Sequence, residues 1–462
     1  MKREKKPQTL VFINPWIYDF AAYDLWSKPL GLLYLAGYLR ACGFAVTLID
    51  CMNIHRTGSQ DAAHCKSPVR RRFGTGKFLR EQVPKPPQLT DIGRPYSRYG
   101  IPRDLFVREV SRIEKPAAFL VTSLMTYWYP GVFEAIGIIR EIHPDVPIIL
   151  GGIYARLCQN HAVLHSEATS VITETAPVSI LAALQSFDIR SPGGPVKSLP
   201  LPYPAFDLLG SNDYICLMTS SGCPFRCKYC VSHFLNPDPI RRDPHEVFQE
   251  ILYWHEKFGI RDFAFYDDAL LISSSTHMGI VLEEVLKNNL PVRFFTPNAL
   301  HVREITWDIA ELLKQTGFRT IRLGYETADP DLHRRLDSKV SAGDFERAVT
   351  SLRKAGFTRE EIGAYILTGL PGQTVDSVSE TIDVVAGTGA TPYLAEYSPI
   401  PHSDLWGEAV QSSSYDLETE PLYHNNTLLP CWNPDQREAF QQLKKRVIEI
   451  RRNPPNSSKN VL

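Results

Sequence analysis

Residues 214–230 read YICLMTSSGCPFRCKYC, a β-rich run that leads directly into a loop with three cysteines. Cys223, Cys227 and Cys230 stand in a Cys-x3-Cys-x2-Cys pattern. Three thiolates can bind three irons of a cubane cluster and leave the fourth iron open to a substrate or cofactor. A zinc site using His233 as a further ligand, or buried cysteines without metal, are the alternatives. The spacing and the loop position favour an iron–sulfur site.

The cysteine loop opens an alternation of strands and helices that continues to about residue 405. Strands are predicted at YICLMT, DFAFYD, VRFFTP, TIRLGYE, GAYILTG and PYLAEYSP. Six such βα units form a partial TIM-type barrel, in which functional groups gather beyond the carboxyl ends of the strands. The cysteines are expected at that end because they follow the first strand.

The N-terminal part shows the same alternation, with strands predicted at TLVFIN, FAVTLI, AAFLVT, PIIL and TSVIT. This pattern predicts a doubly wound, flavodoxin-like parallel sheet whose ligand site lies at the carboxyl ends of its strands. A Pro-, Gly- and Arg-rich segment at about 51–115 interrupts the pattern and is expected to be an insertion or a long functional loop.

A chain of 462 residues exceeds what one hydrophobic core usually supports. We therefore expect a doubly wound domain at 1–190, a Pro-rich linker at 191–210, the barrel at 211–405 and a C-terminal extension at 406–462. The extension contains an amphipathic helix from about Pro434 to Arg452.

The composition points to a cytoplasmic enzyme with a small-molecule substrate. Lys and Arg number 50 against 51 Asp and Glu, which offers no electrostatic footprint for nucleic acid or an anionic membrane. The apolar run near the N-terminus is too short for a signal peptide or a spanning helix. Nine unevenly spaced cysteines argue for a metal site and against a disulfide framework.

The cysteine loop resembles the signature of the radical S-adenosylmethionine (SAM) superfamily, which places an aromatic residue before the last cysteine, as Tyr229 does here. The resemblance extends from about Leu10 to Ala409. It implies a [4Fe-4S] cluster whose open iron binds SAM, and one-electron cleavage of SAM to a 5′-deoxyadenosyl radical. It also implies an electron donor such as flavodoxin or ferredoxin.

Further positions are carried over from the family to the strand ends of the barrel. Glu326 would contact the amino or ribose groups of SAM, and the turn at Gly369 and Gly372 would lie beside the adenine. Their alternatives are an exposed carboxylate and an ordinary turn. Asp268 and Asn298 are expected to face the cleft, with helix capping as the alternative. The residues expected on the SAM side are Tyr229, Asp268, Asn298, Glu326, Gly369 and Gly372.

The N-terminal half resembles the cobalamin-binding domain of one radical SAM subfamily. The resemblance rests on PLGLLYLA at 29–36, Thr122-Ser123-Leu124 and the glycine pair at 151–152. The Asp-x-His-x-x-Gly loop that supplies an axial histidine elsewhere is replaced by Asp50-Cys51-Met52-Asn53, so cobalamin would bind without a protein histidine. A differently used flavodoxin-like domain is the alternative. The residues expected on the cobalamin side are Ser123, Leu124, Tyr127, Gly151 and Gly152.

Two features stay open. Residues 70–77 read RRRFGTGK, but Phe78 follows the lysine where a P-loop needs Ser or Thr. We interpret the segment as a basic loop, with an anionic substrate or the cobalamin phosphate as the sharper alternative. Cys431 is interpreted as a buried thiol, against hydrogen-atom donation near a radical site.

The leading hypothesis is a cobalamin-dependent radical SAM enzyme that methylates an unactivated carbon or phosphorus. The second is a radical enzyme that rearranges, cyclises or otherwise modifies its substrate without methyl transfer. A third, of another class, is an iron–sulfur binding or electron-transfer protein without catalysis. The sequence identifies no catalytic residue beyond the cofactor-binding ones and does not define the substrate.

Overall fold

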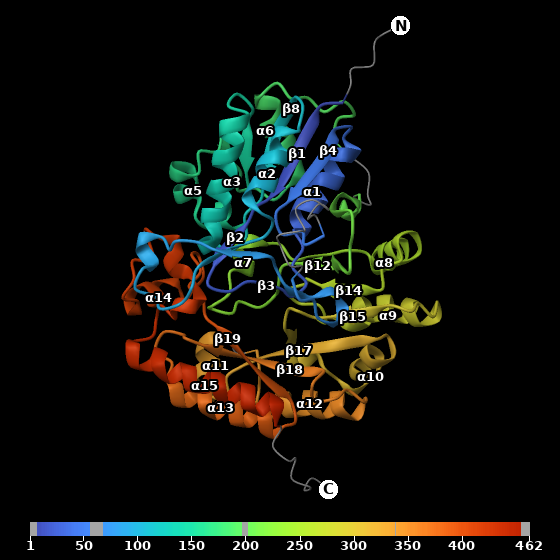
Figure 1. The fold of residues 1–462 in the computed structure, drawn as a ribbon. Helices are drawn as coiled ribbons and strands as arrows, with labels where there is room; N and C mark the ends of the chain where they lie inside the picture. Colours follow the sequence, from blue (N-terminus) through green and yellow to red (C-terminus); the bar gives the residue numbers. More distant parts are fainter. Residues whose placement is uncertain (1–6, 56–67, 196–201, 338, 454–462) are drawn as a thin grey trace. The chain divides into compact units, whose positions relative to one another are not determined.

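A computed structural model describes residues 7–55, 68–195, 202–337 and 339–453 (Figure 1). The chain forms two compact units: Met1–Asp213 with Thr419–Leu422, and Tyr214–Glu418 with Tyr423–Leu462. Residues 56–67 of the expected insertion and 196–201 of the expected linker lie outside the described residues. No helix in the described ranges combines the length and apolar character that a bilayer-spanning segment needs.

The first unit is built on a five-stranded parallel sheet in the order β10-β9-β8-β1-β4. The chain runs outward from β1 to β4 and then returns to β8 on the other side of β1, which confirms the doubly wound fold. The strands are β1 (Thr9–Asn14), β4 (Ala45–Asp50), β8 (Pro116–Val121), β9 (Ile148–Leu150) and β10 (Ser170–Val171). The helices are α1 (Leu30–Ala41), α2 (Arg103–Ser111), α3 (Tyr129–Ile142), α4 (Ile153–Leu157), α5 (Gln159–His165) and α6 (Pro177–Ser186).

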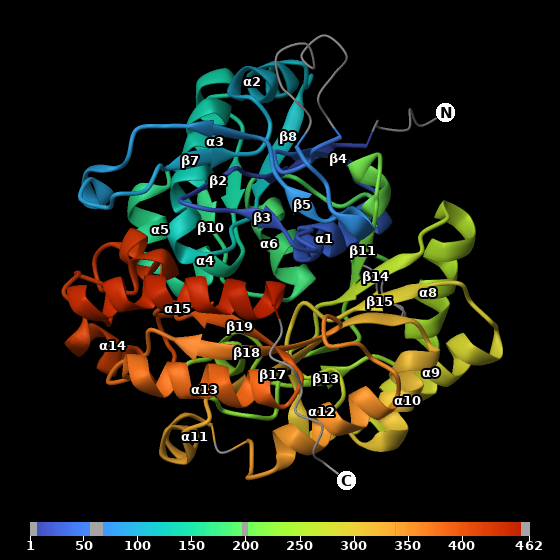
Figure 2. The ribbon, with the colours of Figure 1, turned by 60° about the horizontal axis from the view of Figure 1, so that its bottom comes forward.

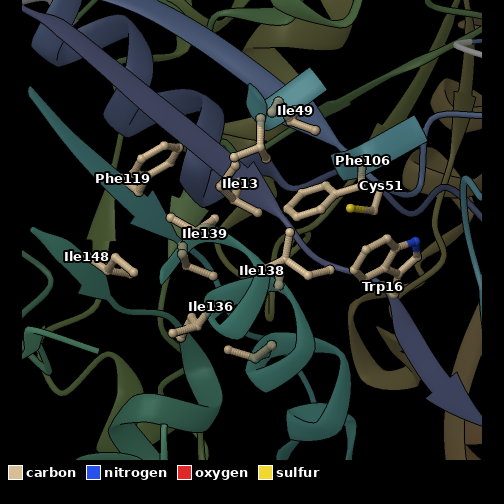
Figure 3. Packing of buried hydrophobic residues seen from close by; sticks show 14 of the residues in the cluster. Ile13, Trp16, Ile49, Cys51, Phe106, Phe119, Ile136, Ile138, Ile139 and Ile148 are labelled. Atoms are coloured by element: carbon tan, nitrogen blue, oxygen red, sulfur yellow. The ribbon is translucent and has the colours of Figure 1, made fainter. Parts of the chain in front are cut away.

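The core of this unit follows from the alternation of side chains along its strands. Val11 and Ile13 of β1 pack with Phe106 of α2 and with Ile136 and Ile139 of α3. Figure 3 shows Ile13 at the centre of this cluster, between residues of β4, α2 and α3. Burial of this face fixes the register of β1, because a shift of one residue would turn these side chains to the other face.

The expected insertion forms two small antiparallel sheets with the segment that follows β1. One pairs β2 (Ile17–Asp19) with β7 (Ser97–Tyr99), and β7 with β6 (Arg80–Gln82). The other pairs β3 (Tyr23–Asp24) with β5 (Gly76–Lys77). The stretch 51–115 also contains α2, which belongs to the connection between β4 and β8.

The second unit is built on parallel strands in the order β11-β14-β15-β17-β18-β19, with β16 (Leu300–His301) paired beside β17. The six strands predicted for a partial barrel are present, and the order ends at β11 and β19. They are β11 (Ile215–Leu217), β14 (Asp262–Phe265), β15 (Arg293–Phe295), β17 (Phe318–Glu326), β18 (Ile362–Thr368) and β19 (Thr391–Glu396). The helices between them are α8 (Pro244–Phe258), α9 (Met278–Lys287), α10 (Trp307–Gln315), α11 (Pro330–Leu336), α12 (Asp344–Lys354) and α13 (Val375–Gly387).

The amphipathic helix near the C-terminus is present as α15 (Pro434–Arg452). Asn433 and Gln436 form a capping box at its start. The helix packs against α13 and β19, and Figure 2 shows it beside α13. Before it, α14 (Trp406–Ser412) belongs to the same unit. The C-terminal helix therefore covers the last strand of the barrel.

Candidate functional site

The cysteine loop lies at the carboxyl end of β11 and is held at both sides. Before it, β12 (Ser220–Ser221) pairs with β13 (Ile240–Arg241). Within it, the Lys228 N–H donates to the Leu336 carbonyl at 2.8 Å, and the Lys228 carbonyl accepts from Leu405 N–H at 2.8 Å. These bonds tie the loop between Cys227 and Cys230 to the end of α11 and to the start of α14, so its conformation is fixed by the fold.

Asp267 anchors the entry to this loop. Its buried carboxylate accepts hydrogen bonds from the Thr219 N–H at 3.1 Å, the Ser220 N–H at 2.6 Å and both hydroxyl groups at 2.7 Å. Asp267 follows β14, whereas Thr219 and Ser220 follow β11. The carboxylate thus joins two neighbouring strand ends directly before Gly222 and Cys223. Sequence analysis missed this role, although Asp267 stands beside the predicted Asp268.

The three thiols of the cysteine loop do not converge on one point. Across the described residues, no three Cys, His, Asp or Glu side chains form a group that could hold one metal ion. In a cubane cluster each thiolate binds its own iron, so wider separation is required. Burial raises the pKa of all three thiols, that of Cys227 to about 11. A metal ion bound by these thiols would deprotonate them.

A buried ion pair between Lys339 and Glu326 lies next to Cys227. The Lys339 ammonium is 3.0 Å from Glu326 Oε1, 3.4 Å from Asp337 Oδ2 and 3.8 Å from Cys227 Sγ. It also donates to the Tyr229 hydroxyl at 2.8 Å, and this hydroxyl donates to Glu326 Oε1 at 3.0 Å. Burial alone would lower the pKa of Lys339, but the charges of Glu326, Cys227 and Asp337 raise it. The structure thus brings the predicted Glu326 and Tyr229 together around a fixed cation that sequence analysis missed.

Glu326 is also strained. Its φ is +67°, a left-handed conformation that disfavours residues with a side chain, and the pairing of β17 with β18 shifts register between Gly324 and Glu326. Its side chain is buried. Strain of this kind persists where the surrounding structure enforces it, and it concentrates at functional sites. Glu326 is therefore not an exposed carboxylate at a strand end, which was the alternative interpretation.

Asp268 and Asn298 make contacts at the neighbouring strand ends. Asp268 accepts a hydrogen bond from the Ser232 hydroxyl at 2.5 Å, directly after Cys230. The Asn298 amide donates to the Tyr266 carbonyl at 2.8 Å and so links the ends of β14 and β15. Neither caps a following helix. Their contacts support the end of the cysteine loop and the strand edge around it.

The predicted glycine turn follows β18. Gly369 and Gly372 have φ of +94° and +70°, so both use conformations that glycine alone adopts easily. The Gln373 side chain closes the turn, accepting from the Gly369 and Leu370 N–H groups at 3.0 and 3.2 Å and donating to the Leu367 carbonyl at 2.9 Å. The turn is therefore preformed without a ligand.

His301 lies beside the cysteine loop, and Cys431 lies in a buried apolar cluster of the second unit. His301 Nε2 lies 3.8 Å from Cys223 Sγ, and its ring contacts Phe225. Burial, with a smaller effect of Lys339, lowers its pKa to about 4, so it is a neutral ring beside a cysteine. Cys431 is buried in an apolar cluster with Leu405 and Leu417, and burial raises its pKa to about 11.

In the first unit, a small hollow lies at the point where the strand order reverses. Its volume is about 20 Å³, which holds roughly one water molecule. A larger ligand would therefore lie on this surface and not inside a cavity. Residues following β1, β4 and β8 contribute to it, as do the residues before α1. Its lining includes Asn14, Trp16, Lys28, Met52, Ser123, Leu124 and Trp128.

Of the residues expected on the cobalamin side, the hollow brings together Ser123 and Leu124. Tyr127 is buried and is not part of the hollow's lining. Gly152 has φ of +97°, and a Cβ there would overlap the Ser123 backbone, whereas Gly151 has room for one. Gly152 therefore permits close packing of the β8 and β9 ends.

Comparisons with known proteins found similarity in family, in sequence and in fold. Residues 217–385 match the family model of the radical SAM superfamily, so the second unit contains a radical SAM domain. An uncharacterised methyltransferase of Pyrococcus horikoshii is 26% identical over 229 residues, covering 46% of this chain and 47% of that protein. An anaerobic magnesium-protoporphyrin IX monomethyl ester cyclase of Rubrivivax gelatinosus is 23% identical over 365 residues, covering 70% and 64%.

The similarity in fold extends over both units. The structure of TsrM, a radical SAM methyltransferase from Kitasatospora setae solved with cobalamin and a [4Fe-4S] cluster bound, superposes with a TM-score of 0.62 at 16% identity. The match covers 88% of this chain and 78% of TsrM. The chain spans less than two thirds of the length of the curated relatives named above. The fold class predicted from sequence is thus confirmed.

Proposed function

We propose that this protein is a cobalamin-dependent radical SAM methyltransferase acting on an unactivated carbon or phosphorus of a small molecule. The observation that carries the proposal is the three-cysteine loop at the end of β11, anchored by Asp267 and backed by the buried Lys339–Glu326 pair. Cys223, Cys227 and Cys230 would hold a [4Fe-4S] cluster. When bound and reduced by a flavodoxin- or ferredoxin-type donor, the cluster supplies the electron that cleaves SAM.

The neighbouring residues are suited to holding SAM in place. The Glu326 carboxylate beside Cys227 is complementary to the amino group of an amino acid, and the Lys339 ammonium holds that carboxylate in place by donating to Oε1. Tyr229 fixes the orientation of both. Gly369 and Gly372 lack Cβ atoms, and at Gly372 the nearest atom to the place of a Cβ is Arg335 Nη1 at 3.6 Å, which permits close approach of a flat ring there. These groups bind and orient, and none of them is assigned a proton-transfer role.

The cobalamin part rests on the hollow of the first unit, which lies at the crevice where doubly wound folds bind ligands. The fold similarity to TsrM and the methyltransferase relative support it. Met52 lines the hollow, and His55 is hydrogen-bonded through Nε2 to Asp213 at 3.1 Å. No histidine is among the described residues that line this hollow, so the cofactor would bind without an axial protein ligand.

Anaerobic reconstitution with iron and sulfide tests the radical SAM part. The wild-type chain should gain about four irons and form 5′-deoxyadenosine from SAM and dithionite. Cys227→Ala should lose both the cluster absorption and 5′-deoxyadenosine, whereas Cys216→Ala, a buried cysteine of β11 outside the loop, should keep both. Retention of cluster and cleavage in Cys227→Ala would overturn the proposal.

A second candidate is cyclisation without methyl transfer, which the similarity to the cyclase over 70% of the chain favours. S-Adenosylhomocysteine distinguishes the two, because methyl transfer from SAM to cobalamin releases it and cyclisation does not. Protein made in cobalamin-rich medium should show corrin absorption bands. Their absence, together with 5′-deoxyadenosine formation, would leave the radical SAM assignment standing and refute the methyltransferase.

A further inference from the structure

The first unit contains a second cavity, of about 490 Å³, that is separate from the small hollow. Binding sites for small molecules typically enclose about 300–1,000 Å³, so its size suits a ligand. Its walls come from the segment after β1, which contains β3, and from the insertion strands β5, β6 and β7. The lining includes Tyr23, Lys77, Phe78, Arg80, Arg98 and Tyr99.

Strand pairing places these residues side by side. Tyr23 lies opposite Lys77 in the pairing of β3 with β5, and Arg80 lies opposite Tyr99 in the pairing of β6 with β7. Phe78 and Tyr99 belong to a small buried cluster, which makes the floor of the cavity apolar. The cavity is therefore a consequence of the insertion's two sheets and not a gap between loops.

The cavity is attached rigidly to the carboxyl edge of the parallel sheet. The Ile101 N–H donates to the carbonyl of Cys51, the first residue after β4, at 2.7 Å, and the Trp16 indole donates to the Ile101 carbonyl at 2.7 Å. Gly100 has φ of +127°, and a Cβ there would overlap Cys51 and Trp16. The wall at Gly100 and Ile101 thus cannot move independently of β1 and β4.

The charges on the walls do not balance. Arg98 is 2.5 Å from Glu81 and 3.1 Å from Glu134, and Arg103 is 3.2 Å from Glu134, so two cations compensate two carboxylates. Lys77 and Arg80 have no described carboxylate within ion-pair distance, and both side chains are exposed at the cavity. Two positive charges therefore face the cavity without a carboxylate partner among the described residues.

The structure also separates the members of the basic segment RRRFGTGK. Arg70 forms an ion pair with Asp24 at 2.6 Å and bonds to the carbonyls of Gly74 and Lys77, so it is a structural residue. Arg72 is exposed and lies over the Phe73 ring. Lys77 alone among these three faces the cavity. The segment is thus not a uniform basic loop.

We propose that this cavity binds a small phosphate monoester with a flat apolar group, at a site in the first unit that is separate from the cobalamin hollow. Two unpaired cations match the dianion of a phosphate monoester, whereas a carboxylate would leave one cation uncompensated. A guanidinium and an ammonium supply the fork and the point charge that phosphate recognition uses. Phe78, Tyr99 and Tyr23 supply apolar and aromatic surface for the ester group. The inference does not depend on the proposed methyl transfer.

Isothermal titration calorimetry with phenyl phosphate tests the proposal on the full chain, with cluster and cobalamin loaded. Lys77→Met and Arg80→Met should each weaken binding by at least about tenfold. Arg72→Met is the matched control, because it removes a nearby cation that does not line the cavity, and it should bind as the wild type does. Tyr23→Ala should weaken phenyl phosphate while leaving inorganic phosphate unchanged. Circular dichroism of each variant verifies that it is folded.

The source of the phosphate is settled by the same measurement on chain without cobalamin. Equal affinity in the loaded and cobalamin-free chains supports a separate ligand. Loss of binding on loading would show that the phosphodiester of the cofactor occupies the cavity, which overturns the proposal. Equal affinity in wild type, Lys77→Met, Arg80→Met and Arg72→Met would overturn it as well, because binding would then owe nothing to this cavity.

Discussion

Asp267→Asn tests whether the cysteine loop depends on the neighbouring strand end. The carboxylate is buried and accepts from two N–H groups and two hydroxyls on Thr219 and Ser220. An asparagine offers one acceptor oxygen in place of two. In the structure Oδ1 accepts from all four donors and Oδ2 only from the Thr219 N–H, so asparagine keeps the main acceptor, makes it neutral and places its amide NH2 against the Thr219 N–H.

The size of the effect follows from this count. Hydrogen bonds to a charged acceptor contribute about 1.5–3 kcal/mol each and those to a neutral acceptor about 0.5–1.5 kcal/mol, so weakening the four bonds should make unfolding easier by roughly 2–5 kcal/mol. Because Thr219 and Ser220 lead directly into Cys223, the loop should also lose order. We expect the iron content after anaerobic reconstitution to fall below half of the wild-type value.

Urea unfolding and iron determination measure the two effects. Asp262→Asn is the matched control, since this buried carboxylate on β14 itself pairs with Arg293 at 2.6 Å at the amino end of the same strand. It should destabilise by about 1 kcal/mol, because Arg293 is partly exposed, and leave the iron content unchanged. Wild-type iron content and stability in Asp267→Asn would refute the reasoning. Equal iron loss in both variants would show that general destabilisation, and not the loop contact, is responsible.

Three further outcomes are expected. Lys339→Met leaves the Glu326 carboxylate buried without its cation, so the free energy of unfolding in urea should fall by about 3–5 kcal/mol. The double variant Lys339→Met/Glu326→Gln should recover part of this loss. Strictly additive effects of the two substitutions would contradict the prediction. Burial lowers the pKa of His424 to about 4, so the folded chain keeps it neutral while the unfolded chain takes up a proton below about pH 6.5. The contribution of neutral His424 to the free energy of unfolding is complete above pH 6.5 and falls by about 3 kcal/mol as the pH drops toward 4. Urea unfolding of His424→Gln should therefore depend less steeply on pH than unfolding of the wild type. Gly152→Ala should destabilise by about 3 kcal/mol through backbone overlap and strain, whereas thermal or urea unfolding of Gly151→Ala should match wild type; equal loss in both would refute the packing role.

The strands and the cysteine loop were predictable because their signals are local. Each predicted strand is a short apolar run between turn residues, and the cysteines stand within eight positions of one another. Glu326 could be predicted for the same reason, because it is an acidic residue at the end of a recognisable strand. Carboxyl ends of parallel strands share one edge, so position along a strand is enough to place such a residue.

Lys339 and Asp267 could not be placed in this way. Lys339 reaches Cys227 because α11 turns the chain back toward the strand ends, and the lysine is 112 residues from the cysteine that it approaches. Asp267 bonds to a segment 48 residues earlier. In both cases the partner is set by strand order and helix packing, which a single sequence does not specify. The cavity of the insertion has the same origin, since β2 pairs with a strand about eighty residues later.

Stability alone does not explain the residues around Cys227. A buried ion pair such as Lys339 with Glu326 often contributes no more to stability than apolar residues of the same volume, because desolvation offsets the attraction between the charges. The left-handed backbone at Glu326 adds strain of about 1–3 kcal/mol. The site therefore combines two unfavourable features at the carboxyl end of β17, where Lys339 also lies within 3.8 Å of a cysteine sulfur. A fixed cation beside a cluster ligand and a fixed carboxylate next to it are useful when a charged cofactor must bind in one orientation, and this requirement accounts for both features together.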